Sequence, residues 1–123
     1  MAEAELKVIV KAQQLAAHTM RVSSNYKHFP KKYRFSLVSK IQNKALEIYE
    51  YLHEANRTDL KAYKRERLEL QTKAITYCDE LIFYIELSHE LNLISEGSMK
   101  YWSGLVKDIK HMAIAWRTSD RER

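Results

Sequence analysis

Glycine and proline are scarce in this 123-residue chain, which contains two glycines and one proline. Average usage would supply several times more of each. Strand hairpins and phosphate-binding loops both need glycine, because only glycine adopts a positive φ angle without strain. The scarcity therefore argues against a β-rich fold and against a glycine-rich nucleotide loop, and it predicts long helices.

Cysteine and long apolar runs are also lacking. Cys78 is the single cysteine, so neither an internal disulfide nor a thiolate metal cluster is expected. No apolar run approaches the roughly 20 residues that a membrane-spanning helix requires. Glu3 and Glu5 lie where a secretory signal would carry positive charge, so we expect a cytoplasmic protein without a membrane partner. The length fits one domain, residues 1–123.

The sequence contains no P-loop, dinucleotide glycine fingerprint, zinc-protease motif or nucleophile elbow. His53 and His89 are each followed by glutamate, but Arg57 and Leu93 stand where a zinc motif would place its second histidine. Cys78 lies on an apolar helical arc, which indicates a buried, unreactive thiol. We therefore expect a protein that is not an enzyme and that uses no metal or other cofactor.

Apolar residues recur at helical spacing in four segments. Pro30 suits the first position of the second segment, Thr58 or Asp59 can cap the third, and Ser95 can cap the fourth. The segments are residues 4–24, 30–55 and 58–91 and the stretch that follows Ser95. Short connections make neighbouring helices antiparallel, so the predicted fold is all-α, an up-down-up-down four-helix bundle.

Two of the predicted helices are more apolar than a four-helix protomer requires. The later half of the third helix is apolar over a wide arc. The first helix has two apolar stripes, one formed by Val8, Ala12, Leu15 and Val22 and the other by Leu6, Val10, Ala17 and Met20. A second stripe needs a second neighbour, which predicts a homo-oligomer; the alternative is a monomer with a generous core.

The net charge is +5, and residues 1–35 alone carry that excess. Lys31 and Lys32 would occupy the first turn of a helix that starts at Pro30, where cations oppose the helix dipole at roughly 0.3–1 kcal/mol each. Unpaired backbone N–H groups at such an end suit phosphate. Tyr26 and Tyr33 lie within the same basic stretch and can stack on bases. The segment predicts a phosphate clamp; a solvated turn is the alternative.

A second basic cluster follows residue 60, and two further lysines are stacked one turn apart on the second helix. Glu66 and Glu69 reduce the net positive charge of the second cluster, so its alternative interpretation is a series of ion pairs on the helix surface. The candidate nucleic-acid-binding residues are Lys27, Lys31, Lys32, Arg34, Lys40, Lys44, Lys61, Lys64, Arg65 and Arg67.

Four short motifs carry a resemblance to a known family. They are Phe29-Pro30, Arg34-Phe35-x-Leu37, Ile41-Gln42-Asn43 and Leu46-Glu47. Together they resemble the four-helix-bundle superfamily of 23S rRNA intervening-sequence proteins. Those proteins usually follow the second helix with a stretch reading like Ile-Pro-x-Asn-Ile-Ala-Glu-Gly, whereas this chain continues in helix to residue 55. That departure favours the accessory variability determinant (Avd) branch, which belongs to diversity-generating retroelements.

The resemblance implies a pentameric barrel of four-helix protomers with a basic exterior. It also implies association with a reverse transcriptase and binding of RNA, DNA or both, without catalysis. Two other functions stay open: an intervening-sequence-type bundle for which nucleic-acid binding is incidental, and a protein–protein adaptor whose basic patches meet acidic protein. Phosphate contacts would give a steep dependence of affinity on salt, which separates these functions.

Overall fold

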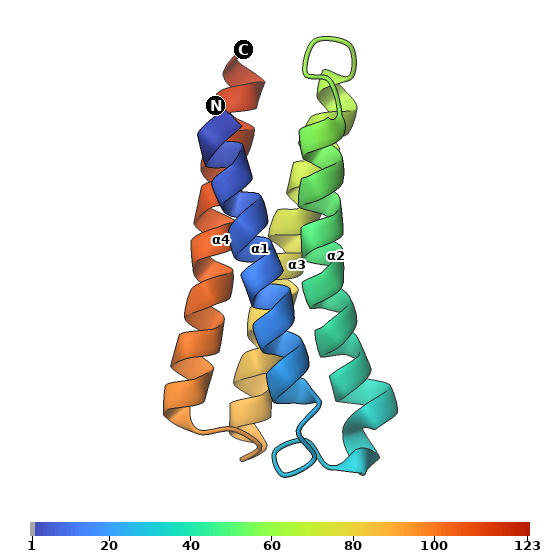
Figure 1. Cartoon of the computed structure of the whole chain (residues 1–123), viewed down its shortest axis with the longest axis vertical. Coiled ribbons are helices and arrows are strands. Elements are labelled where there is room, and N and C mark those ends of the chain that lie inside the picture. The colour runs from blue at the N-terminus through green and yellow to red at the C-terminus, as the bar shows by residue number, and fades with distance from the viewer. Residues whose placement is uncertain (1) are drawn as a thin grey trace.

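The structure is a computed structural model that describes residues 2–123, with side chains described from residue 7 onward. Four long helices lie side by side, with connections at alternate ends (Figure 1). They are α1 (Ala2–Ser23), α2 (Ser39–Arg57), α3 (Lys64–Glu90) and α4 (Glu96–Glu122). Each helix packs against two others, α1 and α3 both lying between α2 and α4. The predicted up-down-up-down bundle is confirmed, and residues 2–123 contain no strand.

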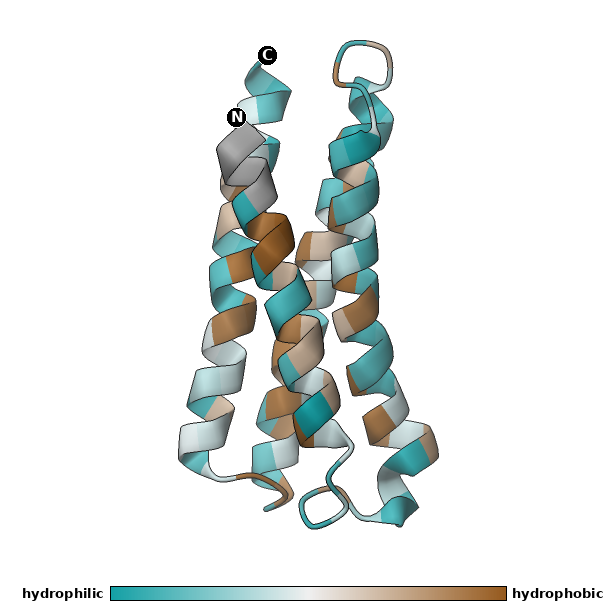
Figure 2. Ribbon diagram, viewed as in Figure 1, coloured by the Kyte–Doolittle hydropathy of each residue, from teal (hydrophilic) through white to brown (hydrophobic). Residues whose placement is uncertain are grey.

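The core is built from one stripe on each helix. Helical spacing predicts one core-facing stripe on the second segment, formed by Val38, Ile41, Ala45, Ile48, Leu52 and Ala55. The last five lie on α2 and are fully buried, whereas Val38, which precedes α2, is only half-buried. On α4, the buried stripe is Trp102, Val106, Ile109, Ala113 and Trp116. Burying a large apolar side chain stabilises the fold by about 1.5–3 kcal/mol. Figure 2 shows the resulting hydrophobic and hydrophilic bands along the helices.

The two predicted stripes of α1 have different surroundings. Val8, Ala12 and Leu15 are buried against the other helices. Val10 and Met20, from the other stripe, are 47% and 37% exposed. Ala17 of that stripe is also exposed, and Leu6 lies outside the residues whose side chains are described. The protomer therefore leaves one apolar stripe of α1 uncovered.

The second helical segment does not begin as the regular α-helix predicted from Pro30. Lys31–Tyr33 form a 3₁₀ turn (η1) and Arg34–Val38 form a π-helical turn (η2), after which α2 continues. Phe29, before these turns, and Leu37, within the π-helical turn, are both buried and attach the segment to the bundle. Lys31 and Lys32 therefore lie in a short 3₁₀ turn, and not, as predicted, in the first turn of a long α-helix whose dipole they would oppose.

The start of α3 also differs from the prediction. Asp59 caps a separate turn, in which its carboxylate accepts a hydrogen bond from the Ala62 N–H at 2.7 Å and its carbonyl accepts one from the Tyr63 N–H at 2.9 Å. Regular helix then begins at Lys64. The predicted cap at Asp59 thus belongs to the connection, and α3 is shorter than expected.

The sequence predicts a short corner at Asn92-Leu93-Ile94, and the chain turns there between α3 and α4. Asn92 has a φ of 62°, the left-handed conformation that Asn tolerates better than most residues. The N–H groups of Asn92 and Leu93 bond to the carbonyls of His89 and Ser88, both at 2.9 Å, which completes a Schellman motif. Ser95 caps α4 by accepting a hydrogen bond from the Ser98 N–H at 3.1 Å.

A buried ion pair joins α3 to α4. The Arg67 Nε lies 2.7 Å from Oδ2 of Asp120, which also accepts a 2.7 Å hydrogen bond from the Gln71 side chain. Asp120 and Gln71 are fully buried and Arg67 is 6% exposed. A further Arg67 N–H donates to the Thr58 carbonyl at 3.1 Å, and the guanidinium lies 5.1 Å from the Trp116 ring. Arg67 also donates to the Ala55 carbonyl of α2 at 3.4 Å, so it links α3 to both α4 and α2.

Candidate nucleic-acid interface

The positive charge is concentrated in a stretch that contains no acidic residue. Between Glu5 and Glu47 the chain has nine lysines and arginines and no aspartate or glutamate. The charge excess of residues 1–35 indicated this region but did not show that acidic residues are missing as far as Glu47. The stretch covers most of α1, the start of α2 and the segment between them, which we call the connector, residues 24–38. Such a single-sign region attracts polyanions.

The connector is folded onto the end of the bundle. Phe29 is 1% exposed and meets Trp102 edge-on, with ring centroids 6.4 Å apart. The N–H groups of His28 and Phe29 bond to the Asn25 carbonyl at 3.0 and 2.9 Å. With Phe29 directed inward, Lys27, Lys31 and Lys32 are all exposed. Arg34 is exposed as well, so the connector exposes all four of its predicted cations.

Exposed aromatic rings lie close to two of these cations, Lys31 and Arg34. Tyr26 is 55% exposed and Phe35 is 89% exposed. The Arg34 guanidinium donates a hydrogen bond to the Tyr26 hydroxyl and lies 5.7 Å from the Tyr26 ring and 5.9 Å from the Phe35 ring. Lys31 also lies 5.7 Å from the Tyr26 ring. Cations and aromatic faces in alternation are typical of surfaces that bind single-stranded nucleic acid. Phe35 was not among the predicted site residues.

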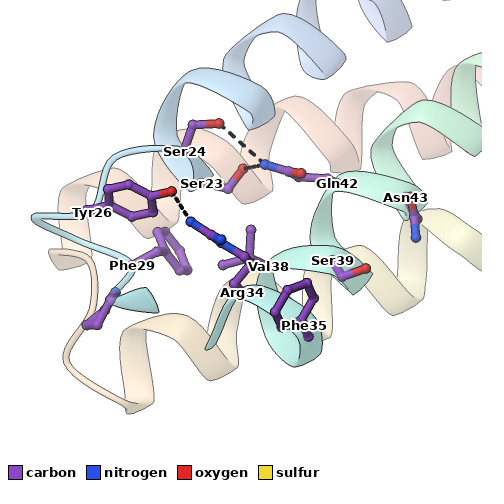
Figure 3. A pocket seen from close by; sticks show the side chains of 11 residues that line it. Ser23, Ser24, Tyr26, Phe29, Arg34, Phe35, Val38, Ser39, Gln42 and Asn43 are labelled. Carbon is purple, nitrogen blue, oxygen red and sulfur yellow. Dashed lines mark hydrogen bonds between the residues drawn. The ribbon is translucent and has the colours of Figure 1, made fainter. Parts of the chain in front are cut away.

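A cavity of about 370 Å³ opens beside this cluster. Figure 3 shows Arg34 and Tyr26 pointing toward one another across it, with Phe35 beside Arg34 on the π-helical turn. Gln42 closes its inner side by donating hydrogen bonds to the hydroxyls of Ser23 at 2.9 Å and Ser24 at 3.4 Å. None of the residues that line the cavity is acidic. The cavity thus combines an aromatic, a cationic and a hydrogen-bonding wall.

The two candidate lysines of α2 lie away from this cavity. Lys40 is exposed and borders an apolar hollow between α2 and α3. The Lys44 ammonium lies 2.6 Å from a Glu80 carboxylate oxygen and 3.7 Å from the Tyr77 ring centre. Burial alone would lower the pKa of Lys44, but the hydrogen bond and charge of Glu80 outweigh it, so the pKa is raised. Lys44 is paired within the protomer, which corrects its assignment as a phosphate contact.

The second predicted cluster lies at the opposite end of the bundle from the connector (Figure 1). Sequence spacing predicts Lys61 one helical turn before Arg65 on a shared face, but Lys61 falls in the α2–α3 connection. Lys64 donates a 2.9 Å hydrogen bond to the Arg121 carbonyl, and Arg65 lies 3.9 Å from carboxylate oxygens of Glu66 and Glu69. These contacts fit the alternative of surface ion pairs.

Arg67 is the clearest correction to the candidate residues. It is the buried partner of Asp120 described above, and only 6% of its surface is exposed. A buried guanidinium that already neutralises a carboxylate cannot also contact phosphate without breaking the bundle. Cys78 is 0% exposed as predicted, and burial, aided by the charge of Asp79, raises the pKa of its thiol to about 12.

Among the described residues, no three histidine, cysteine, aspartate or glutamate side chains are grouped so as to hold a metal ion. A search of the same residues found no helix with the length and apolar content that crossing a membrane demands.

Comparison with known proteins gives a fold. No protein-family model matches the chain, and no curated protein matches it significantly. The structure is similar to the crystal structure of a protein of unknown function from the S23 ribosomal protein family of Bacteroides thetaiotaomicron. The TM-score is 0.83 at 13% sequence identity, over 94% of this chain and 98% of the other. This likeness confirms the predicted bundle; membership of the intervening-sequence superfamily and of its Avd branch stays a prediction.

Proposed function

We propose that this protein is a non-enzymatic accessory factor that binds RNA, and also DNA, through the connector. The observation that carries the proposal is the acid-free stretch between Glu5 and Glu47, whose central connector exposes four cations together with Tyr26 and Phe35. The resemblance of its motifs to Avd supports a role beside a reverse transcriptase in a diversity-generating retroelement. The intervening-sequence-type bundle and the protein adaptor are the competing functions.

The uncovered stripe of α1 supports a homo-oligomer. Val10, Gln13, Ala17 and Met20 follow one another at intervals of three and four residues, the spacing of a helix–helix seam. Leu46 on α2 is also exposed, at 39%, and adds an apolar side chain outside the protomer core. The residues named carry no formal charge. A second copy of the chain fits this surface, and the resemblance to Avd implies a ring of five.

Oligomerisation would strengthen nucleic-acid binding. Each protomer of a ring repeats the connector, so one strand can contact several connectors at once. Linked sites raise the overall affinity without any new kind of contact, provided that the strand can reach them together. Individually weak phosphate contacts can therefore give a stable complex.

A protein partner has an apolar surface available beside the connector. An apolar hollow of about 340 Å³ is lined by Tyr33 and Leu37 of the connector and by Tyr84, Leu87 and Leu91 at the end of α3. We place the reverse transcriptase there. Leu91→Asp should weaken capture of a reverse transcriptase encoded next to this protein and leave RNA affinity unchanged. Ile114→Asp, at a position equally exposed on α4, is the matched control. If both variants captured the reverse transcriptase equally well, the hollow would not be its binding site.

Salt dependence of RNA affinity tests the proposed function. Fluorescence anisotropy with a labelled single-stranded RNA of about 20 nucleotides should show log affinity falling linearly with log salt, by about 0.7 for each neutralised phosphate. Four connector cations predict a slope near −3 for each engaged protomer. Unrelated RNAs of equal length should bind alike, and a preference above about a hundredfold would mean base-specific readout. Absence of binding at low salt would favour the adaptor.

A further inference from the structure

We propose that the cavity beside Arg34 accepts one unpaired nucleobase of the bound strand, so that the protein selects single-stranded over double-stranded nucleic acid. This inference rests on the proposed function, since it assumes that the polyanion at the connector is a nucleic acid. It adds a base-binding site to a surface whose charge alone would hold any phosphate backbone.

The size of the cavity suits a single base. At about 370 Å³ it lies at the lower end of the range for small-molecule sites, roughly 300–1,000 Å³. Phe29 and Val38 provide an apolar floor, and the amide of Asn43 offers both a hydrogen-bond donor and an acceptor. A duplex keeps its bases inside the stack, so a paired base must first leave its partner to enter.

The wall formed by Phe35 is the strongest argument for an aromatic ligand. Phe35 is 89% exposed, the highest value among the large hydrophobic side chains described. A base stacked on its ring would remove apolar surface of both partners from water. The π-helical turn that presents Arg34 and Phe35 is a rare conformation that is concentrated at functional sites.

Besides a site for the base, a nucleotide needs cations for its phosphate, and Arg34 and Lys31 supply them. The Arg34 guanidinium lies near both the Tyr26 and the Phe35 rings, and Lys31 lies over Tyr26. A base that enters beside Phe35 therefore keeps its own phosphate within reach of Arg34 and Lys31. Guanidinium groups bind phosphate through two parallel hydrogen bonds and also stack on planar rings.

The test compares one labelled RNA strand, the same strand annealed to its complement, and an abasic strand of equal charge. Wild-type protein should bind the single strand at least tenfold more tightly than either of the others. Phe35→Ala should weaken single-strand binding by about 5- to 150-fold, the range for loss of one stacked base. Its affinity for duplex and its salt slope should stay unchanged, and Phe35→Trp should restore the preference.

Controls keep the test independent of folding and assembly. Phe35 is nearly fully exposed, so its removal leaves the core intact, which circular dichroism and light scattering will verify. Phe83→Ala removes a 57% exposed ring on α3 and should change nothing. Equal affinity of wild type for all three ligands, with a steep salt slope, would overturn the base site and leave the proposed function standing. No binding to any of them would overturn both, and tighter capture of a phosphotyrosyl peptide than of RNA would also overturn the base site.

Discussion

Replacement of Arg67 by methionine should destabilise the bundle without weakening RNA binding. The substitution keeps most of the apolar stem but leaves the Asp120 carboxylate, which is fully buried, without the guanidinium 2.7 Å away. Removing one partner of a buried ion pair typically lowers the free energy of unfolding by 3–5 kcal/mol. For a chain of this length, that loss corresponds to a fall in Tm of roughly 10–20 °C.

Urea unfolding followed by circular dichroism, at fixed protein concentration, measures this loss. Arg65→Met removes a guanidinium whose side chain is 82% exposed and should change the free energy of unfolding by less than about 0.5 kcal/mol. Exchanging both partners, Arg67→Met with Asp120→Leu, should recover part of the loss because no buried charge remains. An Arg67→Met protein of wild-type stability with reduced RNA affinity would refute the structural role and return Arg67 to the binding surface.

Two further predictions concern the outer stripe of α1 and the buried thiol. Ala17→Glu places a charge in the proposed seam, so light scattering should give the 14.6 kDa protomer, whereas wild type should give a multiple of that mass; a wild-type mass of 14.6 kDa contradicts the oligomer. The pKa of Cys78 is raised from 9.0 to about 12, so the unfolded thiol ionises first as pH rises above about 9 and stability should decline there. Cys78→Ala should remove part of that decline, and an identical pH profile in both proteins would contradict the burial of the thiol.

The features that sequence predicted well are those set by local chemistry. Ile41, Ala45 and Ile48 share a face because of helical periodicity alone, and this is where they are buried. Ser95 suits a helix cap, and Asn92 marks the corner, because of the conformations and hydrogen bonds available to their own side chains. Such signals need no knowledge of distant residues.

The features that sequence missed depend on partners far along the chain. Arg67 is buried because Asp120 lies opposite it, 53 residues later, and Lys44 is neutralised by Glu80 on another helix. The same holds for the segment with the π-helical turn, which Phe29 and Leu37 attach to the bundle. A list of basic residues therefore combined the exposed connector cations with structural ones that only the fold can separate.

Charge reversal at the connector tests the central claim most directly. Lys31→Glu with Lys32→Glu should abolish RNA binding at about 0.15 M salt and reduce the salt slope by about 1.4 per engaged protomer, while Tm and assembly are retained. Lys61→Glu with Arg65→Glu makes the same change in net charge at the opposite end of the bundle and should leave most of the affinity. Wild-type affinity in the first variant, or the larger loss in the second, would contradict the assignment of the connector as the nucleic-acid interface.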